Sequence, residues 1–297
     1  MVYIRSKVVK GIPYAYLVKS EWDDKRGSSI QHTIKYLGRA DSVVISDIPE
    51  EYRNDPKILS FLSSHSSKNQ AKKQALLEEL RAELFEALCN ADREKAVKIA
   101  AKYQSLFNLV DFYDDLMTPV LYQVGDLWAQ NSLSVATEHV CSNTAIGLVE
   151  AINESNSGKG KKSSSYTTIV ICSPEGELHQ IASKVIESLL LQKGFNIHNM
   201  SPSAPSGSIS SYIESTKPAL VMVSVTLSEN LKAAIRLLNT IRAKSNVPVF
   251  MGGAAIKVLS EENRKKLERS HEKLTLVEET SLQRIMQLVK KVSHIKQ

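Results

Sequence analysis

Hydrophobic and polar residues alternate along the first part of the chain. Three runs, Val2–Val9, Tyr14–Ser20 and Ile30–Leu37, place apolar side chains at about every second position. This is the period of a strand with one buried face. Glycine, proline and polar residues separate the runs, as they do at turns. The pattern predicts a small antiparallel β-sheet within residues 1–45.

The alternation stops beyond this sheet. Residues 46–70 contain Pro49, Pro56 and a run rich in serine, histidine and asparagine, with little periodicity, and we expect a linker there. From residue 71 to residue 153, apolar side chains recur at spacings of three and four, which predicts helices. We expect four of them in an antiparallel bundle, the last beginning at Val135 with Ser134 as its N-cap.

The remaining chain changes pattern again. Residues 154–166 are polar and rich in glycine, serine and lysine, which predicts a second linker. Within residues 167–297, short apolar strands alternate with helices. The predicted strands are Thr168–Cys172, Asn196–Met200, Ala219–Val225, Val247–Met251 and Leu274–Val277. Such alternation predicts an α/β fold with a flavodoxin-like, five-stranded parallel sheet, which binds ligands at the carboxyl ends of its strands.

Composition narrows the class of protein. The chain has 297 residues, of which 42% are hydrophobic, and it is long enough for two globular cores. Its apolar runs are far shorter than the roughly 18 residues of a membrane span. The amino terminus does not resemble a secretory signal. We therefore expect a cytoplasmic protein without membrane contact, whose three cysteines, Cys89, Cys141 and Cys172, are buried thiols.

Positive charge is concentrated at the amino terminus. The net charge of the chain is +6, and residues 1–40 hold eight lysines and arginines against three acidic residues. This surplus favours an acidic partner such as nucleic acid, although a solvated basic face would have the same composition.

One histidine follows the first predicted strand of the α/β region. His179 lies in the loop after Cys172, where such folds bind ligands. Neutral imidazole is a good ligand for a transition metal, and a carboxylate on its other nitrogen, here from Glu177, would fix the tautomer. The alternative is an ordinary helix start with an incidental acid and histidine.

Two other predicted strands end in residues suited to a ligand. Ser224, Thr226 and Ser228 supply hydroxyl groups after the third strand. Gly252 and Gly253 end the fourth strand, where missing side chains would let a ligand approach the backbone. Each feature is common by itself, but together they gather polar groups and space at one sheet edge.

With these motifs, residues 71–295 resemble the cobalamin-binding module, in which a helical cap domain precedes a flavodoxin-like domain. The tetrad Gly176-Glu177-Leu178-His179, with Ser224 and Gly252-Gly253, is similar to the base-off, His-on signature of that family. The resemblance implies that His179 is the lower axial ligand of cobalt in place of the dimethylbenzimidazole of the cofactor. It also implies that the displaced nucleotide tail occupies a slot along the serine and glycine positions.

The helical region resembles one branch of the family. Trp128, Val135 and the pair Glu138-His139 are similar to the cap motif of adenosylcobalamin photoreceptors of the CarH and LitR type, in which these residues surround the upper axial adenosyl group. Ala129 departs from that branch, because some photoreceptors have a second cobalt-binding histidine there. Residues 1–70 lack a winged-helix pattern, so DNA binding does not carry over by resemblance.

Three hypotheses follow. The first is a cobalamin-binding sensor or regulator, not an enzyme, which is light-responsive, binds adenosylcobalamin and changes its homo-oligomeric state. The second is a corrinoid carrier for methyl transfer, which would hold methylcobalamin. The third is an interaction module without a cofactor.

Overall fold

The computed structural model describes residues 2–9, 12–23, 28–40, 42–65, 67–156, 167–278 and 281–293. The chain divides into two compact units. The first unit comprises residues 1–83 and 102–107, and the second comprises residues 84–101 and 108–297. The boundary falls within helix α2 (Ser67–Cys89).

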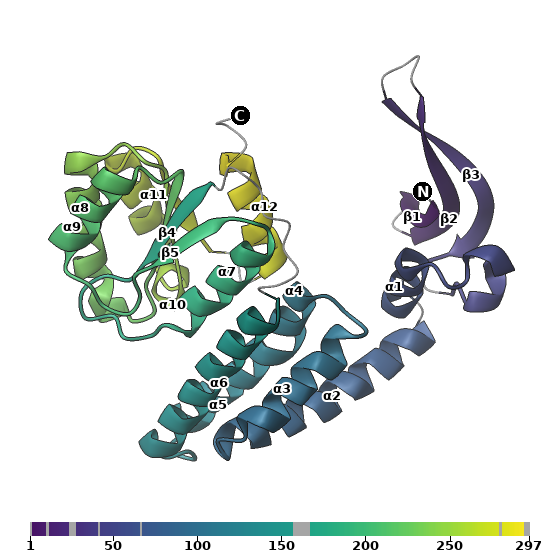
Figure 1. Cartoon of the computed structure of the whole chain (residues 1–297), viewed down its shortest axis with the longest axis horizontal. Helices are drawn as coiled ribbons and strands as arrows, with labels where there is room; N and C mark the ends of the chain where they lie inside the picture. The colour runs from purple at the N-terminus through teal and green to yellow at the C-terminus, as the bar shows by residue number, and fades with distance from the viewer. Residues whose placement is uncertain are drawn as a thin grey trace. The chain divides into compact units, whose positions relative to one another are not determined.

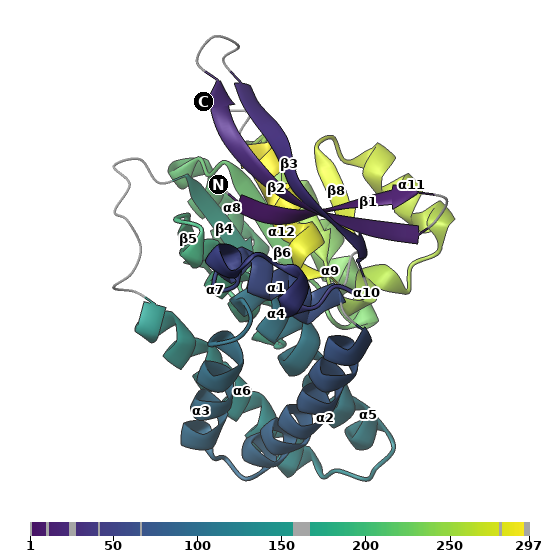
Figure 2. The ribbon, with the colours of Figure 1, turned by 90° about the vertical axis from the view of Figure 1, so that its right-hand side faces the viewer.

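The first unit contains the predicted antiparallel sheet. Its strands are β1 (Val2–Val9), β2 (Ile12–Asp23) and β3 (Ser28–Arg39), in the order β1-β2-β3. The long β2–β3 ribbon continues beyond the end of β1 (Figure 2). Two β-bulges interrupt the pairing of β2 with β3. The three-stranded prediction is confirmed.

The prediction of a linker over residues 46–70 is wrong, because this segment contains regular structure and part of the core. It forms two short 3₁₀ turns, η1 (Ile45–Asp47) and η2 (Glu50–Tyr52), and then helix α1 (Pro56–His65). The buried side chains that pack against the sheet from this segment are Ile48, Ile58 and Leu62. Pro56 misled the prediction, since proline at the first position of a helix is compatible with it.

The helical region contains α3 (Arg93–Gln104), α5 (Thr118–Ala129) and α6 (Val135–Asn156) after α2. A short α4 (Leu109–Asp111) and a π-helical segment, η3 (Phe112–Met117), lead directly into α5. Pro119, in the first turn of α5, lacks the N–H that would continue the α-helical hydrogen bonding, which explains a π-helical segment at this point. Ser134 caps α6 as predicted, its Oγ accepting a hydrogen bond from the Thr137 N–H at 3.0 Å. Residues 157–166 of the second predicted linker lie outside the described residues.

The α/β region is a flavodoxin-like domain, as predicted. Its parallel sheet has the order β5-β4-β6-β7-β8. The strands are β4 (Thr168–Cys172), β5 (Asn196–Asn199), β6 (Leu220–Ser224), β7 (Val249–Gly252) and β8 (Leu274–Val277). The helices are α7 (Ile181–Gln192), α8 (Ser206–Thr216), α9 (Leu231–Lys244), α10 (Ala254–Lys257), α11 (Glu261–Ser270) and α12 (Leu282–Ser293), with a 3₁₀ turn, η4 (Ser228–Asn230), before α9. Figure 1 shows α8 and α9 on one side of β4 and β5, and α7 and α12 on the other.

The π-helical segment joins the helical region to the flavodoxin-like domain. Tyr113 donates a buried hydrogen bond from its hydroxyl group to Ser188 of α7 at 2.9 Å. Asp114 accepts hydrogen bonds from the backbone N–H of Leu282, at 3.1 Å to each carboxylate oxygen, and so caps the start of α12. Burial is the main cause that raises the pKa of Asp114. These contacts fix the base of α5 beside the sheet.

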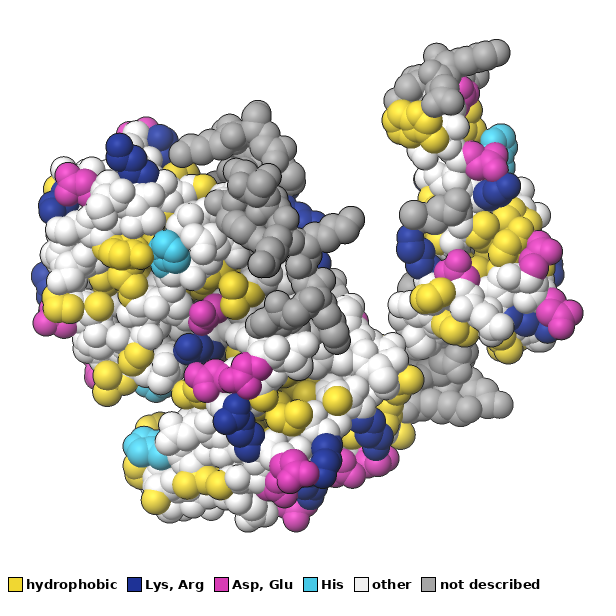
Figure 3. All heavy atoms as spheres, in the orientation of Figure 1, with side chains coloured by type: hydrophobic (Ala, Val, Ile, Leu, Met, Phe, Trp, Pro, Cys, Tyr) yellow, Lys and Arg dark blue, Asp and Glu magenta, His cyan; other side chains and the backbone are white. Residues whose placement is uncertain are grey.

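Surface charge over α3 is mixed in sign. Figure 3 shows acidic and basic side chains beside one another over the helical region. In the ion pairs Lys98–Glu94 and Lys95–Glu86, the nitrogen and oxygen atoms are 2.6 and 2.7 Å apart. None of the helices in the described part of the chain is long and apolar enough to cross a membrane.

Candidate functional site

Three neighbouring strands of the flavodoxin-like sheet carry the predicted site residues at their carboxyl ends. The tetrad beginning at Gly176 follows β4, Ser224 is the last residue of β6, and Gly252 is the last residue of β7. Because β4, β6 and β7 are adjacent in the sheet, the motifs lie along one edge. This is the edge at which open α/β sheets bind their ligands.

The carboxylate of Glu177 organises this edge. Its side chain has no exposed surface, and it accepts five hydrogen bonds. Oε1 accepts from the Nδ1 of His179 at 2.6 Å and from the backbone N–H of His179 at 3.1 Å. Oε2 accepts from the backbone N–H groups of Thr226 and Leu227 at 2.8 and 3.1 Å and from Nδ2 of Asn230 at 3.0 Å. Glu177 therefore ties the β4 loop to the β6 loop.

These hydrogen bonds also determine the ionisation of Glu177. Burial by itself would raise its pKa, but the donors from Leu227, Asn230, His179 and Thr226 outweigh burial and hold the pKa below its usual value. An ionised carboxylate only accepts hydrogen bonds, so Nδ1 of His179 must carry a proton. In the neutral imidazole, Nε2 then keeps its lone pair.

The imidazole of His179 is accessible. Its side chain is 53% exposed, and among the described residues Nε2 has no hydrogen-bond partner. A half-exposed imidazole with one nitrogen fixed by a buried carboxylate is suited to ligating a metal.

Two residues that contact the Gly176–His179 tetrad were not predicted from the sequence. Asn230 ends the η4 turn and donates to Glu177. Ser203 accepts a hydrogen bond from the N–H of Gly176 at 3.0 Å, and Gly176 has a φ of +89°, which glycine adopts at little cost. Neither polar residue belongs to a periodic motif, so only the folded loops bring them to the site.

The hydroxyl-bearing residues at and after the end of β6 have different surroundings. Ser224 and Thr226 are half-buried, whereas Ser228 is exposed. Within the described part of the chain, the Ser224 hydroxyl has no hydrogen-bond partner, so it can bind a polar ligand group. Leu178, also predicted to contact the cofactor, is 71% exposed beside His179.

The two glycines after β7 do not leave open space, which corrects the reason given for them from the sequence. A Cβ atom on Gly253, whose φ is +117°, would lie 2.3 Å from the backbone oxygen of Val225. A Cβ atom on Gly252 would lie 3.2 Å from the backbone oxygen of Val277. Both glycines allow the ends of neighbouring strands to approach closely, so they shape the edge through backbone packing.

A second group of predicted residues lies at the far end of α5 and the start of α6. Trp128 is in the last turn of α5 and is 48% exposed, and Val135 begins α6 and is 56% exposed. Glu138 accepts hydrogen bonds at 2.6 Å from Nδ1 of the neighbouring His139 and from Oγ of Ser142. No hydrogen bond within the described residues joins this group to the sheet edge.

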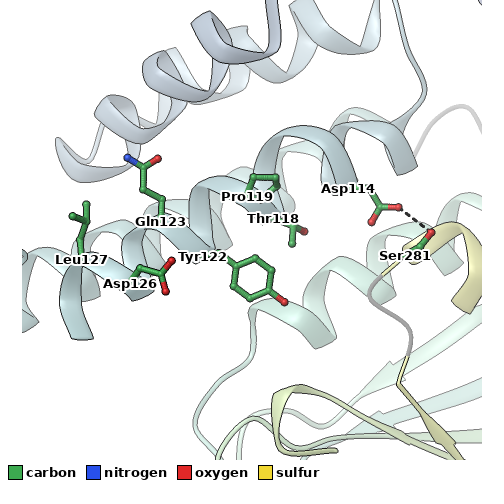
Figure 4. Close-up of a pocket in the computed structure, with 8 residues that line it drawn as sticks. All are labelled: Asp114, Thr118, Pro119, Tyr122, Gln123, Asp126, Leu127 and Ser281. Atoms are coloured by element: carbon green, nitrogen blue, oxygen red, sulfur yellow. Dashed lines mark hydrogen bonds between the residues drawn. The ribbon is translucent and has the colours of Figure 1, made fainter. Parts of the chain in front are cut away.

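A cavity of about 750 Å³ lies along α5. It is lined by Asp114, Thr118, Pro119, Tyr122, Gln123, Asp126, Leu127 and Ser281. Figure 4 shows the Tyr122 ring projecting from α5 toward the flavodoxin-like domain, where its hydroxyl accepts a hydrogen bond from Nζ of Lys257 at 3.2 Å. Lys257 ends α10, just after Gly252-Gly253. None of the predicted site residues lines the cavity, but Trp128 directly follows Leu127.

Two family models, each described as a B12 binding domain, match residues 80–153 and residues 167–268. The chain carries a cobalamin-binding module. Its first part is a helical cap domain and its second part is the flavodoxin-like domain.

Curated relatives of the module come from methanogenic archaea. Dimethylamine corrinoid protein 1 of Methanosarcina mazei is 22% identical over 183 residues, which cover 60% of this chain and 83% of the relative. Trimethylamine corrinoid protein 1 of the same organism is 21% identical over 183 residues, covering 60% of this chain and 85% of the relative. The structure of the monomethylamine corrinoid protein of Methanosarcina barkeri matches this chain with a TM-score of 0.56 at 12% identity. The match covers 71% of this chain and 99% of that protein, so the two share a fold.

The residues present fit a corrinoid. Among the described residues, no three histidine, cysteine, aspartate or glutamate side chains form a metal-binding group. A cobalt ion already held by a corrin ring needs only an axial ligand from the protein, and His179 with its free Nε2 is suited to that role. The hydroxyl of Ser224 at the same edge, which has no partner among the described residues, suits the nucleotide tail.

Proposed function

We propose that this protein is a corrinoid carrier for methyl transfer, with His179 as the lower axial ligand of base-off cobalamin. The buried Glu177 carboxylate, which fixes the tautomer of His179, is the observation that carries the proposal. The relatives support the carrier over the light-responsive regulator, because their names join the corrinoid to methylated amines. When bound, cobalamin supplies a cobalt centre that accepts a methyl group from one molecule and gives it to another.

The protein would control the basicity of the lower ligand. Glu177 accepts the Nδ1 proton of His179, which increases electron density at Nε2. Its other oxygen is held by three donors. Rotation of the imidazole would break its hydrogen bond to this fixed carboxylate, so the bond favours one direction for the lone pair of Nε2.

The cap would cover the upper face of the corrin. Trp128 and Val135 are large apolar side chains left half exposed at the end of α5 and the start of α6. A flat apolar ligand against them would remove both from water, and an indole ring is well suited to such a contact. A carrier must also admit partners to the cobalt, and the contacts at Tyr113 and Asp114 would hold the base of the cap while its outer end moves.

A light-responsive regulator remains the second candidate because of Glu138 and His139. In this reading Glu138 binds the ribose hydroxyls of an adenosyl group. Each oxygen of Glu138 already accepts one hydrogen bond from within α6, and a carboxylate oxygen has room for a further donor.

The two functions differ in the upper ligand that the protein prefers. We would titrate the purified full chain with methylcobalamin and with adenosylcobalamin in darkness, following absorbance, and then record size-exclusion profiles before and after green light. The carrier requires methylcobalamin to bind at least as tightly as adenosylcobalamin, and an unchanged oligomeric state after light. It also requires that the reduced cobalt(I) form of the bound cofactor accept a methyl group from a partner methyltransferase supplied with its methyl donor.

Tighter binding of adenosylcobalamin with light-dependent assembly would favour the regulator. A His179→Ala variant tests whether cobalamin binds through His179, which both functions require and the cofactor-free module does not. If this substitution leaves the affinity and spectrum of either cobalamin unchanged, axial ligation by His179 is refuted.

A further inference from the structure

The three-stranded sheet of the first unit has one face that its own core leaves uncovered. Directly opposed residues of an antiparallel pair share a face. Ile4 and Leu17 are opposed and buried against α1. The alternate pairs, Arg5 with Tyr16 and Lys7 with Tyr14, therefore lie on the other face, called the open face here.

Tyrosine rings gather on the open face. Tyr36 of β3 lies opposite Tyr16 and is 54% exposed. Its ring centroid is 5.1 Å from that of Tyr16 and 6.3 Å from that of Tyr14. Tyr3 of β1 lies on the same face, opposite the buried Val18. The rings of Tyr14, Tyr16 and Tyr36 form a contiguous aromatic surface on this face.

The charge of the open face has one sign. Arg5 and Lys7 are exposed on β1, and Arg39 is opposed to Tyr14 on β3. By the same alternation, Glu21 lies on the covered face, where it pairs with Lys19 at 2.5 Å. The described residues of the three strands thus place no acidic side chain on the open face. This contrasts with the interleaved ion pairs over α3.

We infer that the open face binds single-stranded nucleic acid. Exposed aromatic rings offer surfaces on which unpaired bases stack, and neighbouring cations meet the phosphates between those bases. Four-stranded RNA-binding sheets use ring faces in the same way. A duplex keeps its bases stacked on one another and would leave the tyrosine rings without partners.

Side chains on the open face are already ordered for such contacts. Arg5 donates from Nη1 to Oε1 of Gln31 at 2.6 Å, and Gln31 donates from Nε2 to the Tyr3 hydroxyl at 2.7 Å. This chain of hydrogen bonds crosses the sheet from β1 to β3. It holds the guanidinium group over the sheet with other N–H groups available for phosphate.

The test uses the full chain and a fluorescein-labelled oligonucleotide of mixed sequence, prepared as single-stranded RNA, single-stranded DNA and duplex DNA. Fluorescence anisotropy should show both single strands binding more tightly than the duplex. Binding should weaken steeply between about 50 mM and about 200 mM salt. The ratio of RNA to DNA affinity identifies which single strand the face prefers.

Matched variants separate stacking from charge. Tyr36→Ala should weaken single-strand binding by about tenfold or more, whereas Tyr36→Phe keeps the ring and should bind like the wild type. Lys7→Gln should weaken binding and lower the salt slope by about one. Lys57→Gln removes the same charge from α1, on the covered side, and should leave binding unchanged.

Several results would overturn the inference. These are no binding at low salt, equal affinity for the duplex, or Tyr36→Ala binding as well as Tyr36→Phe. If a polyglutamate peptide displaced the labelled oligonucleotide as effectively as an unlabelled one, the open face would bind anions in general and not single-stranded nucleic acid. Circular dichroism of each variant checks that the sheet is intact, and the Lys7 and Lys57 pair tests the inference without disturbing the rings.

Discussion

Replacement of Glu177 by glutamine would change the ligand state of His179 without changing its position. The three donors at Oε2 would keep the amide oxygen of the glutamine on their side. The new NH₂ group would then face His179, and Nδ1 could only accept its hydrogen bond. The imidazole proton would move to Nε2, which would occupy the lone pair needed for cobalt.

The magnitude follows from the contacts. Hydrogen bonds to a charged group contribute about 1.5–3 kcal/mol each and neutral ones about 0.5–1.5 kcal/mol. Four of the five bonds of Glu177 would become neutral, and the fifth would be lost because the backbone N–H of His179 would face another donor. Allowing for compensation, we expect Glu177→Gln to lower the free energy of unfolding by about 3 kcal/mol. Cobalamin affinity should fall about 10- to 100-fold.

Urea unfolding of the cofactor-free protein and an absorbance titration with methylcobalamin measure these two quantities. His179→Ala is the matched control, because it removes a half-exposed side chain and should lower stability by only about 1 kcal/mol, while it also abolishes axial ligation. A Glu177→Gln variant with wild-type stability and affinity would refute the role given to the carboxylate.

Lowering the pH should remove the contribution of the Glu177 carboxylate to the free energy of unfolding. Its pKa is lower in the folded chain than the ordinary value of 4.5, so the unfolded chain binds its proton first as pH falls. The contribution of Glu177 to stability is therefore full above about pH 4.5 and is lost as pH falls through the lower folded pKa. The stability difference between wild type and Glu177→Gln should shrink over that acidic range in urea titrations.

Three further outcomes test the packing of the second unit. Gly253→Ala should lower the free energy of unfolding by more than about 3 kcal/mol. Gly194 also has a positive φ, but nothing lies near its Cβ position, so Gly194→Ala should lower it by only about 1 kcal/mol. Equal losses for the two variants in urea unfolding would contradict this. Tyr113→Phe should cost about 1–2 kcal/mol, because Ser188 loses its partner, and an unchanged thermal midpoint would argue against the contact. Burial raises the pKa of the Cys141 and Cys172 thiols to about 12, so mass spectrometry should find both unmodified by iodoacetamide at mildly alkaline pH until the chain is unfolded.

Periodicity was sufficient to predict the fold of the second unit because its signals are local. Apolar strands and spaced leucines mark the elements, and the alternation of strands with helices determines a parallel sheet. Pro56 and the isolated Ile58 gave no such signal, because α1 is short and acquires its core contacts only from the sheet. The π-helical segment was also hidden within a regular helical spacing.

The candidate site was only partly predictable. His179 and Glu177 are neighbours in sequence, so their pairing could be expected. Asn230 and the N–H groups of Thr226 and Leu227 reach Glu177 only because β4 and β6 are adjacent. The reason given for Gly253 was different, since a side chain there is excluded by Val225, which directly follows the neighbouring strand β6.

Axial ligation by His179 is the central claim, and electron paramagnetic resonance tests it most directly. Full-length protein would be produced with histidine carrying the heavier nitrogen isotope, loaded with unlabelled cobalamin and reduced to the paramagnetic cobalt(II) state. If His179 is the lower ligand, the nitrogen hyperfine splitting should change from triplets to doublets on labelling, and His179→Ala should abolish the doublets. Triplets that persist in the labelled protein would show that the cofactor keeps its own base, and would contradict the account.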